Sequence, residues 1–204
     1  MKSQTDLALK ALRQGGIVAF PTDTVYGLGA DPANEHAVER IFRVKKRPRG
    51  FPLPLLLADV SSMATFAGSV PEIAWRLAER FLPGGLTLVL RKGASVPLWV
   101  VAGAETVAVR VPNHAVPIAL ARGLGGAVVG TSANLSGEPA PVVADDVRRQ
   151  LGAAVDLVID GGRCPGGTES TVVDLSRERP VILREGAVSR EDVLKVIGRA
   201  LGDV

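Results

Sequence analysis

The sequence predicts one α/β domain of 204 residues built around a mixed β-sheet. Short apolar runs with strand character alternate with amphipathic helical segments along the whole chain. No linker, internal repeat or low-complexity stretch interrupts this alternation. Short strands follow one another closely near the C-terminus, which favours a mixed sheet over a purely parallel one.

The first half of the chain is expected to alternate helices and strands, with helices over residues 3–14, 34–45 and 69–83 and strands over residues 17–20, 53–58 and 86–90. Gly15-Gly16 ends the first helix, and Asn34 is a suitable N-cap for the second. Pro48 stops that second helix, and Pro71 suits the first turn of the third.

The second half contains more strands, expected over residues 106–111, 127–130, 155–159, 172–175 and 181–183, with helices over residues 117–122 and 145–151 and a last one from residue 189. The strand at 106–111 alternates in character, as a half-buried strand does. Ser189 with Asp192 three residues later resembles a capping box and starts the last helix.

Composition is that of an ordinary globular protein, with 47% hydrophobic and 22% charged residues. No apolar run approaches the roughly 20 residues of a membrane span. Residues 1–6 turn polar where a signal peptide would turn apolar, and the single cysteine, Cys164, excludes an intramolecular disulfide and a cysteine-rich zinc site. We therefore expect a soluble cytoplasmic protein with no membrane partner. The net charge of +3 is a weak argument for nucleic-acid binding.

The segment from Phe20 to Gly29 is the most informative part of the chain. The apolar run at 17–20 breaks at Pro21 into Thr22-Asp23-Thr24, and Gly27 and Gly29 follow. Proline cannot donate to a ladder, so the hydroxyls belong to a loop at a strand end. Together with the basic cluster at 43–49, these hydroxyls indicate a small-molecule site for an anionic ligand.

Several common catalytic sites are absent from the sequence. There is no phosphate-binding P-loop and no dinucleotide-binding glycine motif. His36 and His114 have no metal-ligand partner at close spacing, so we expect no protein metal site. The stretch at 130–134 resembles a nucleophile elbow, but Asn134 stands where the second glycine belongs, which weakens a serine-hydrolase interpretation based on Ser132 and His114.

Two sets of cations each allow two interpretations. Lys45 and Arg47 at a helix end either complement the helix dipole or bind a ligand. Arg110 interrupts an apolar strand, and a buried arginine needs an anionic partner. That partner is either a core aspartate or the carboxylate of a ligand.

Further polar residues stand at strand ends, where ligands collect in open α/β sheets. They are Thr24, Ser132, Asn134, Ser170 and Arg184. Each also has an ordinary structural explanation. Ser132 and Asn134 suit a turn or a helix cap, Ser170 stands beside a threonine that suits a β-strand, and Arg184 suits a surface salt bridge. Their combination of hydroxyl, amide and guanidinium groups suits a polyfunctional anion.

The motifs, taken in order, make the sequence similar to the YrdC/Sua5 family of L-threonylcarbamoyladenylate synthases. The matching stretches cover residues 21–28, 45–53, 83–87, 107–112, 131–134 and 169–174. The resemblance extends from about Gly16 to Gly186. Each motif is modest alone, but six in the family's order are specific. The chain resembles the short, single-domain form of the family, so we expect one YrdC-like domain over residues 1–204.

The resemblance implies a twisted mixed sheet flanked by helices, with a large concave basic cavity. It implies synthesis of L-threonylcarbamoyl-AMP from L-threonine, bicarbonate and ATP, with release of pyrophosphate, for the t6A modification of tRNA adenosine 37. Residues carried over for threonine are Thr24, Leu56, Arg110, Gly130 and Ser170. Residues carried over for ATP are Lys45, Arg47, Phe51, Thr106, Ser132, Asn134 and Arg184, with Lys45 and Arg47 as the catalytic pair.

Mg²⁺ is expected with ATP, held largely by phosphate oxygens and water, because the sequence has no carboxylate cluster for it. Expected macromolecular partners are the t6A transferase machinery and, by direct contact, tRNA or another RNA. The alternatives are an RNA-binding or ribosome-maturation module that uses the basic cavity, and a paralogue of the same fold with another carbamoyl-adenylate or nucleotide ligand. Few aromatic residues are available as stacking platforms for RNA bases.

Overall fold

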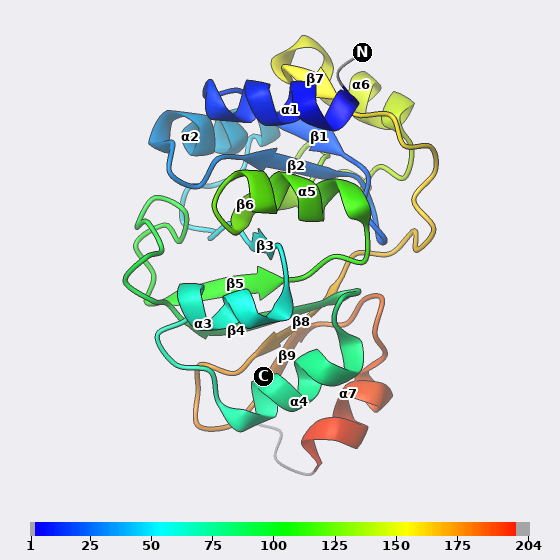
Figure 1. The fold of residues 1–204 in the computed structure, drawn as a ribbon. Coiled ribbons are helices and arrows are strands. Elements are labelled where there is room, and N and C mark those ends of the chain that lie inside the picture. The colour runs from blue at the N-terminus through cyan, green and yellow to red at the C-terminus, as the bar shows by residue number, and fades with distance from the viewer. Residues whose placement is uncertain (1–2, 199–204) are drawn as a thin grey trace.

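A computed structural model describes residues 3–198, and within that range the strands form one nine-stranded sheet (Figure 1). The strand order is β7-β1-β2-β6-β3-β5-β4-β8-β9. Neighbours β1 and β7, β3 and β5, and β4 and β8 are parallel, and the other pairs are antiparallel, which confirms a mixed sheet. The strands are β1 (Val18–Phe20), β2 (Gly27–Ala30), β3 (Leu55–Leu57), β4 (Leu86–Arg91), β5 (Thr106–Arg110), β6 (Ala127–Ser132), β7 (Leu157–Val158), β8 (Thr171–Asp174) and β9 (Val181–Arg184).

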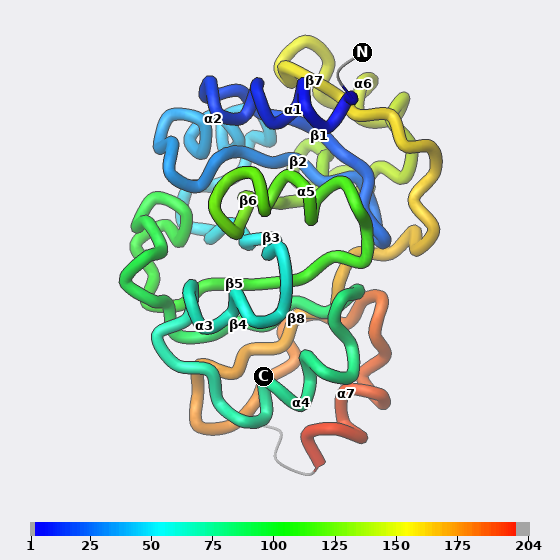
Figure 2. Tube along the Cα trace, in the orientation of Figure 1, coloured from blue at the N-terminus to red at the C-terminus, as the bar shows by residue number. Residues whose placement is uncertain are grey.

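Helices flank the sheet at both ends, as the tube in Figure 2 also shows. Helices α1 and α5 lie against each other, with α1 on β1 and α5 on β6 and β3. At the other end of the sheet, α4 packs on β4 and on α7. The α-helices are α1 (Gln4–Arg13), α2 (Glu35–Lys45), α3 (Met63–Phe66), α4 (Glu72–Phe81), α5 (Ala115–Gly123), α6 (Ala144–Leu151) and α7 (Arg190–Ile197), and the short 3₁₀ helices are η1 (Val60–Ser62) and η2 (Gly152–Ala154).

Side-chain caps start three of the predicted helices. Ser3 and Asp6 form a reciprocal capping box at α1. The side chain of Asn34 accepts a hydrogen bond from the amide of Ala37 at α2, and Ser189 caps α7 in the same way. Each cap satisfies amide groups that have no partner inside the helix, so these boundaries follow directly from local chemistry.

Three elements differ from the sequence prediction. Strand β2 was not among the predicted strands, yet it pairs with both β1 and β6. A Cβ on Gly29 would lie 2.6 Å from the carbonyl oxygen of Val129, so glycine permits this close pairing. Strand β7 covers only Leu157–Val158 of the expected 155–159, and α3 with η1 was not predicted.

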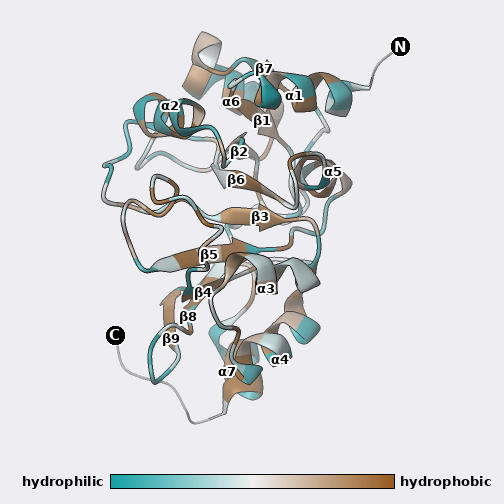
Figure 3. Cartoon of the chain, turned by 60° about the vertical axis from the view of Figure 1, so that its left-hand side comes forward, coloured by the Kyte–Doolittle hydropathy of each residue, from teal (hydrophilic) through white to brown (hydrophobic). Residues whose placement is uncertain are grey.

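The core contains the apolar faces of the strands, which are brown in Figure 3, whereas outer helix faces are teal. Strand β5 shows how the sheet separates core from site. Val107 and Val109 are fully buried in the core, while Thr106, Ala108 and Arg110 line a cavity. This is the period-two alternation expected of a strand with two different faces. None of the helices in the described part of the chain is both long and apolar enough to cross a membrane.

Candidate active site

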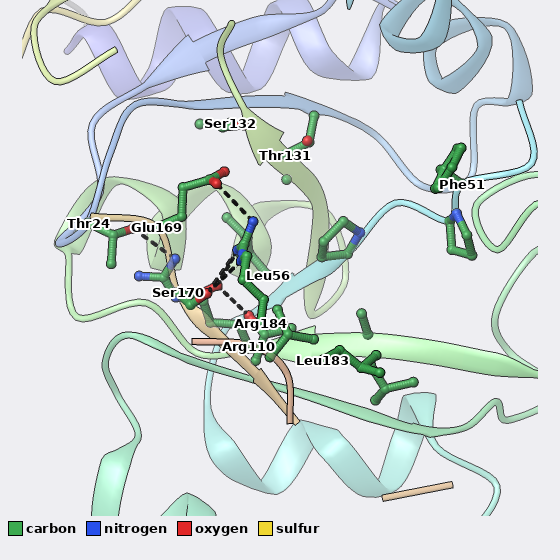
Figure 4. A pocket seen from close by; sticks show the side chains of 18 of the residues that line it. Thr24, Phe51, Leu56, Arg110, Thr131, Ser132, Glu169, Ser170, Leu183 and Arg184 are labelled. Carbon is green, nitrogen blue, oxygen red and sulfur yellow. Dashed lines mark hydrogen bonds and ion pairs between the residues drawn. The ribbon is translucent and has the colours of Figure 1, made fainter. Parts of the chain in front are cut away.

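A cavity of about 780 Å³ lies over the sheet and is shown from close by in Figure 4. Strands from both halves of the sheet contribute to it, together with the loops after β1 and before β3. Its lining is Thr22, Thr24, Val25, Tyr26, Gly27, Arg47, Phe51, Pro52, Pro54, Leu56, Thr87, Val89, Thr106, Ala108, Arg110, Gly130, Thr131, Ser132, Glu169, Ser170, Val172, Asp174, Arg177, Leu183 and Arg184.

Arg110 is a buried cation on the cavity wall. Its Nη2 pairs with the carboxylate of Asp23 at 2.7 Å, its Nη1 donates to Thr24 Oγ1 at 2.9 Å, and its Nε donates to the carbonyl oxygen of Gly84 at 2.9 Å. Burial lowers the pKa of Arg110 from its ordinary value, and Asp23 opposes that change. Of the two partners considered for Arg110, an aspartate or a ligand carboxylate, the one present in the structure is the aspartate Asp23. These contacts use three of the five guanidinium N–H groups, which leaves two for a ligand.

The hydroxyl groups beside Arg110 are held by short networks. Thr22 Oγ1 donates to the carbonyl oxygen of Val25 at 2.7 Å and lies 3.0 Å from Thr24 Oγ1. On the facing strands, Ser170 Oγ and Thr87 Oγ1 are 2.8 Å apart. These networks fix two hydroxyls, those of Thr24 and Ser170, within the same cavity as the guanidinium of Arg110.

Arg47 lines another part of the cavity, just beyond the end of α2. Its Nε and Nη2 donate to the carbonyl oxygens of Phe51 and Pro52, at 3.3 and 3.1 Å, and its guanidinium lies 5.7 Å from the centre of the Phe51 ring. Burial lowers the pKa of Arg47, and Arg184 adds to this effect whereas Glu169 opposes it. The ring of Phe51 is 58% exposed, so an aromatic face is available beside this cation.

Lys45 and Asn134 were expected at the cavity with Arg47 and Ser132, and here the structure corrects the prediction. Neither lines the cavity. The Lys45 ammonium donates to the carbonyl oxygens of Ser132 and Asn134 and to Asn134 Oδ1, and only 2% of the residue is exposed. Burial lowers the pKa of Lys45 to about 8; Arg47 adds to this lowering and Glu169 opposes it. Three acceptors occupy all three ammonium donors, so Lys45 braces the end of α2 against the turn after β6.

Arg184 and Glu169 form an ion pair within the cavity, as Figure 4 shows. Arg184 Nη1 lies 2.8 Å from Glu169 Oε2, while its Nε and Nη2 donate to the carbonyl oxygen of Ser170 at 3.1 and 2.9 Å. A second lining carboxylate, Asp174, pairs with Arg177 at 2.9 Å. Sequence reasoning assigned no role to Glu169, Asp174 or Arg177, although the first two begin and end a motif used for the resemblance.

The remaining predicted residues are also placed. Those that line the cavity are Thr24, Arg47, Phe51, Leu56, Thr106, Arg110, Gly130, Ser132, Ser170 and Arg184. A Cβ on Gly130 would collide with the side chain of Leu56, so glycine leaves room for Leu56 in its present position. His114 does not join Ser132. Its Nδ1 instead accepts from the amide of Val116 as the cap of α5, which removes the basis of a serine-hydrolase pair.

No group of three or more His, Cys, Asp or Glu residues within 3–198 is arranged to hold a metal ion. The cavity lining offers four arginines and two carboxylates among its charged side chains. The arrangement is therefore equipped to hold an anion with guanidinium and hydroxyl donors. Among the described residues that line it, no serine or threonine hydroxyl donates a hydrogen bond to a histidine or a carboxylate.

The chain is similar in sequence to a known protein family and to several named proteins. The family model Sua5_yciO_yrdC, described as "Telomere recombination", matches residues 10–186. A protein named threonylcarbamoyl-AMP synthase from Pyrococcus abyssi (strain GE5 / Orsay) is 44% identical over 192 residues, and one of the same name from Bacillus subtilis (strain 168) is 43% identical. Each alignment covers 94% of this chain and 56% of the relative, so the chain spans little more than half of their length.

A solved structure agrees with the fold. The crystal structure of P. abyssi Sua5 complexed with L-threonine superimposes with a TM-score of 0.93 at 41% identity, covering 98% of this chain and 60% of that one. This superposition confirms the predicted α/β architecture and the family resemblance that the six motifs indicated.

Proposed function

This chain belongs to the Sua5/YciO/YrdC family, and from that premise we propose that it makes L-threonylcarbamoyl-AMP from L-threonine, bicarbonate and ATP. One observation carries the proposal. A single cavity holds Arg110 with two hydroxyls at one part of its wall, and Arg47, Ser132 and Arg184 elsewhere on the same wall. An amino acid and a nucleotide need these two kinds of donor side by side. The lining has four arginines and two carboxylates, and this excess of guanidinium groups supports a basic cavity.

The amino-acid part of the proposed site centres on Arg110. Its two remaining N–H groups would bind the carboxylate of threonine, as arginine binds carboxylates in bidentate fashion. Thr24 and Ser170 would contact the same substrate, with Leu56 and Gly130 closing the wall behind it. Support comes from the crystal structure of P. abyssi Sua5 complexed with L-threonine.

The nucleotide part of the proposed site uses Arg47, Ser132 and Arg184 on the phosphates, with Thr106 and Phe51 beside the rest of ATP. Lys45 and Asn134 would act through position: their hydrogen bonds hold the segments that carry Arg47 and Ser132. The family's K-x-R and S-x-N pairs would then each consist of one residue that meets the ligand and one that braces it.

The chemistry requires no protein nucleophile. The amine of threonine attacks bicarbonate, or the CO₂ in equilibrium with it, to give a carbamate, and water leaves. A carbamate oxygen then attacks the α-phosphorus of ATP, the bond to the β-phosphate oxygen breaks, and pyrophosphate leaves. Holding the reactants together and neutralising the phosphates supply most of the rate in such a reaction.

Magnesium would enter with ATP as part of the substrate. Because no group of three or more His, Cys, Asp or Glu residues within 3–198 is placed to hold a metal ion, we assign Mg²⁺ to the substrate and to no resident site. Phosphate oxygens and water suit Mg²⁺ as ligands, and none of the protein steps above depends on it. The product would feed the t6A modification of tRNA adenosine 37 through a downstream transferase.

A pyrophosphate-release assay tests the proposal. Purified protein with Mg·ATP should release pyrophosphate only when both threonine and bicarbonate are present, and mass spectrometry should detect threonylcarbamoyl-AMP. Equal release without threonine would refute the assignment. Salt-sensitive RNA binding without any threonine binding would instead favour an RNA-binding module.

A further inference from the structure

Glu169 is a carboxylate inside a cavity whose proposed ligand is a polyanion. It points toward Arg184 in Figure 4, and the two charged groups are 2.8 Å apart. The side chains of Arg184 and Glu169 are 44% and 38% exposed, so a ligand in the cavity can reach both. The contact therefore occupies one of the five guanidinium N–H groups of Arg184 and places a negative charge beside the cation that the proposed nucleotide would use.

The charge of Glu169 also acts on two other cations, of which Arg47 lines the same cavity and Lys45 lies buried behind it. Burial lowers the pKa of Arg47 and of Lys45, and in both cases the negative charge of Glu169 opposes that lowering. The other lining carboxylate, Asp174, cannot do the same because Ser176 and Arg177 engage both of its oxygens. Glu169 is thus the carboxylate that neutralises the Arg47–Arg184 part of the cavity.

The backbone around the pair is fixed, whereas the pair itself can exchange. The carbonyl oxygen of Glu169 accepts from the amide of Ala187 at 2.8 Å, and a Cβ on Gly186 would collide with that same carbonyl. Arg184 keeps Nε and Nη2 on the carbonyl oxygen of Ser170 regardless of Glu169. Rotation of the Glu169 side chain alone therefore frees Arg184 Nη1 without moving either strand.

We propose that Glu169 is the resident counter-ion of the phosphate site, displaced when the nucleotide binds and returning to Arg184 as pyrophosphate leaves. The inference rests on the proposed function. One N–H cannot donate fully to a carboxylate and a phosphate oxygen at once, and two anions at one cation repel each other. Glu169 thus weakens the binding of any anion that uses Arg184. It also limits the retention of pyrophosphate after the reaction.

Threonine should be insensitive to this competition. Its proposed partners are Arg110, Thr24 and Ser170, and the resident carboxylate of Arg110 is Asp23. Removing the charge of Glu169 should therefore tighten pyrophosphate binding selectively. A general change in stability or in net charge would not distinguish the two ligands.

Calorimetry with sodium pyrophosphate, without ATP or magnesium, tests this directly. Glu169→Gln should bind pyrophosphate about three- to fivefold more tightly than the wild type, the upper part of the range expected for losing one partly exposed competing pair. Threonine affinity should stay within about twofold. The matched control is Asp145→Asn, which removes the same charge from an exposed 2.7 Å pair with Arg148 outside the cavity lining, and it should change neither affinity.

Two further measurements keep the outcome decisive. Glu169→Ala, which removes the charge without adding an amide, should tighten pyrophosphate binding in the same direction. In an Arg184→Gln background, Glu169→Gln should lose most of its effect. Unchanged or weaker pyrophosphate binding by both Glu169 variants would overturn the counter-ion role. Because these titrations need no turnover, a failure of threonylcarbamoyl-AMP synthesis in the release assay would be seen separately.

Discussion

Replacing Lys45 by methionine tests whether this residue braces the site, as its contacts indicate. The change keeps a long side chain but removes an ammonium that is 2% exposed and serves three acceptors. Each buried acceptor left without a donor costs about 1–3 kcal/mol, and water entering beside Asn134 would recover part of it. We therefore expect a loss of about 3–5 kcal/mol in the free energy of unfolding.

That loss corresponds to a fall of about 6–20 °C in melting temperature for a chain of this size, since each kcal/mol shifts it by about 2–4 °C. Lys46→Met is the control, because it makes the same replacement at the next residue, which is exposed. The assay is thermal unfolding followed by circular dichroism, with pyrophosphate release measured well below both midpoints. If Lys45→Met melts within about 2 °C of Lys46→Met and still loses all turnover, Lys45 acts on the ligand and the bracing role is wrong.

Three further results are expected. Arg110→Lys keeps the charge but cannot serve Asp23, the neighbouring hydroxyl and a ligand together, so calorimetry should show threonine binding weakened roughly thirtyfold and ATP binding within threefold. Arg47→Lys should lower pyrophosphate release at least about tenfold while the melting temperature moves by less than about 3 °C, because lysine lacks the planar fork. Finally, the pKa of Lys45 falls from 10.5 to about 8 on folding, so between these pH values the unfolded chain binds the extra proton. Wild-type stability, measured by urea unfolding, should rise across that window relative to Lys45→Met, and a flat difference would contradict the lowered pKa.

Local chemistry made much of the fold predictable. Helix caps at Asn34 and Ser189 depend on neighbouring residues only, and the sequence identifies them. Strand β2 could not be found this way, because side-chain periodicity is the usual signal and Gly27 and Gly29 carry no side chain. Its strand character comes from ladders to β1 and β6, and β6 lies about a hundred residues away.

The candidate site shows a similar division. Arg110 was identified because a charge inside an apolar strand is conspicuous, yet its partner Asp23 is 87 residues away and spacing could not reveal it. Lys45 and Arg47 looked equivalent from their spacing. Helix α2 ends at Lys45, and the left-handed Lys46, with φ of 51°, redirects the chain before Arg47. One therefore faces the core and the other faces the cavity.

The order of strands has a consequence for how the protein matures. Residues 27–30 pair with residues 129–132, and residues 86–89 pair with residues 171–174, so the two walls of the cavity join segments that lie far apart in the sequence. Such a high contact order favours slow, cooperative folding. A ribosome adding about 5–20 residues per second must therefore deliver the chain at least to Arg184 before the cavity can close. Ligand binding therefore reports that the whole sheet has assembled. A ligand that binds the finished cavity would also shift late folding intermediates toward the native state.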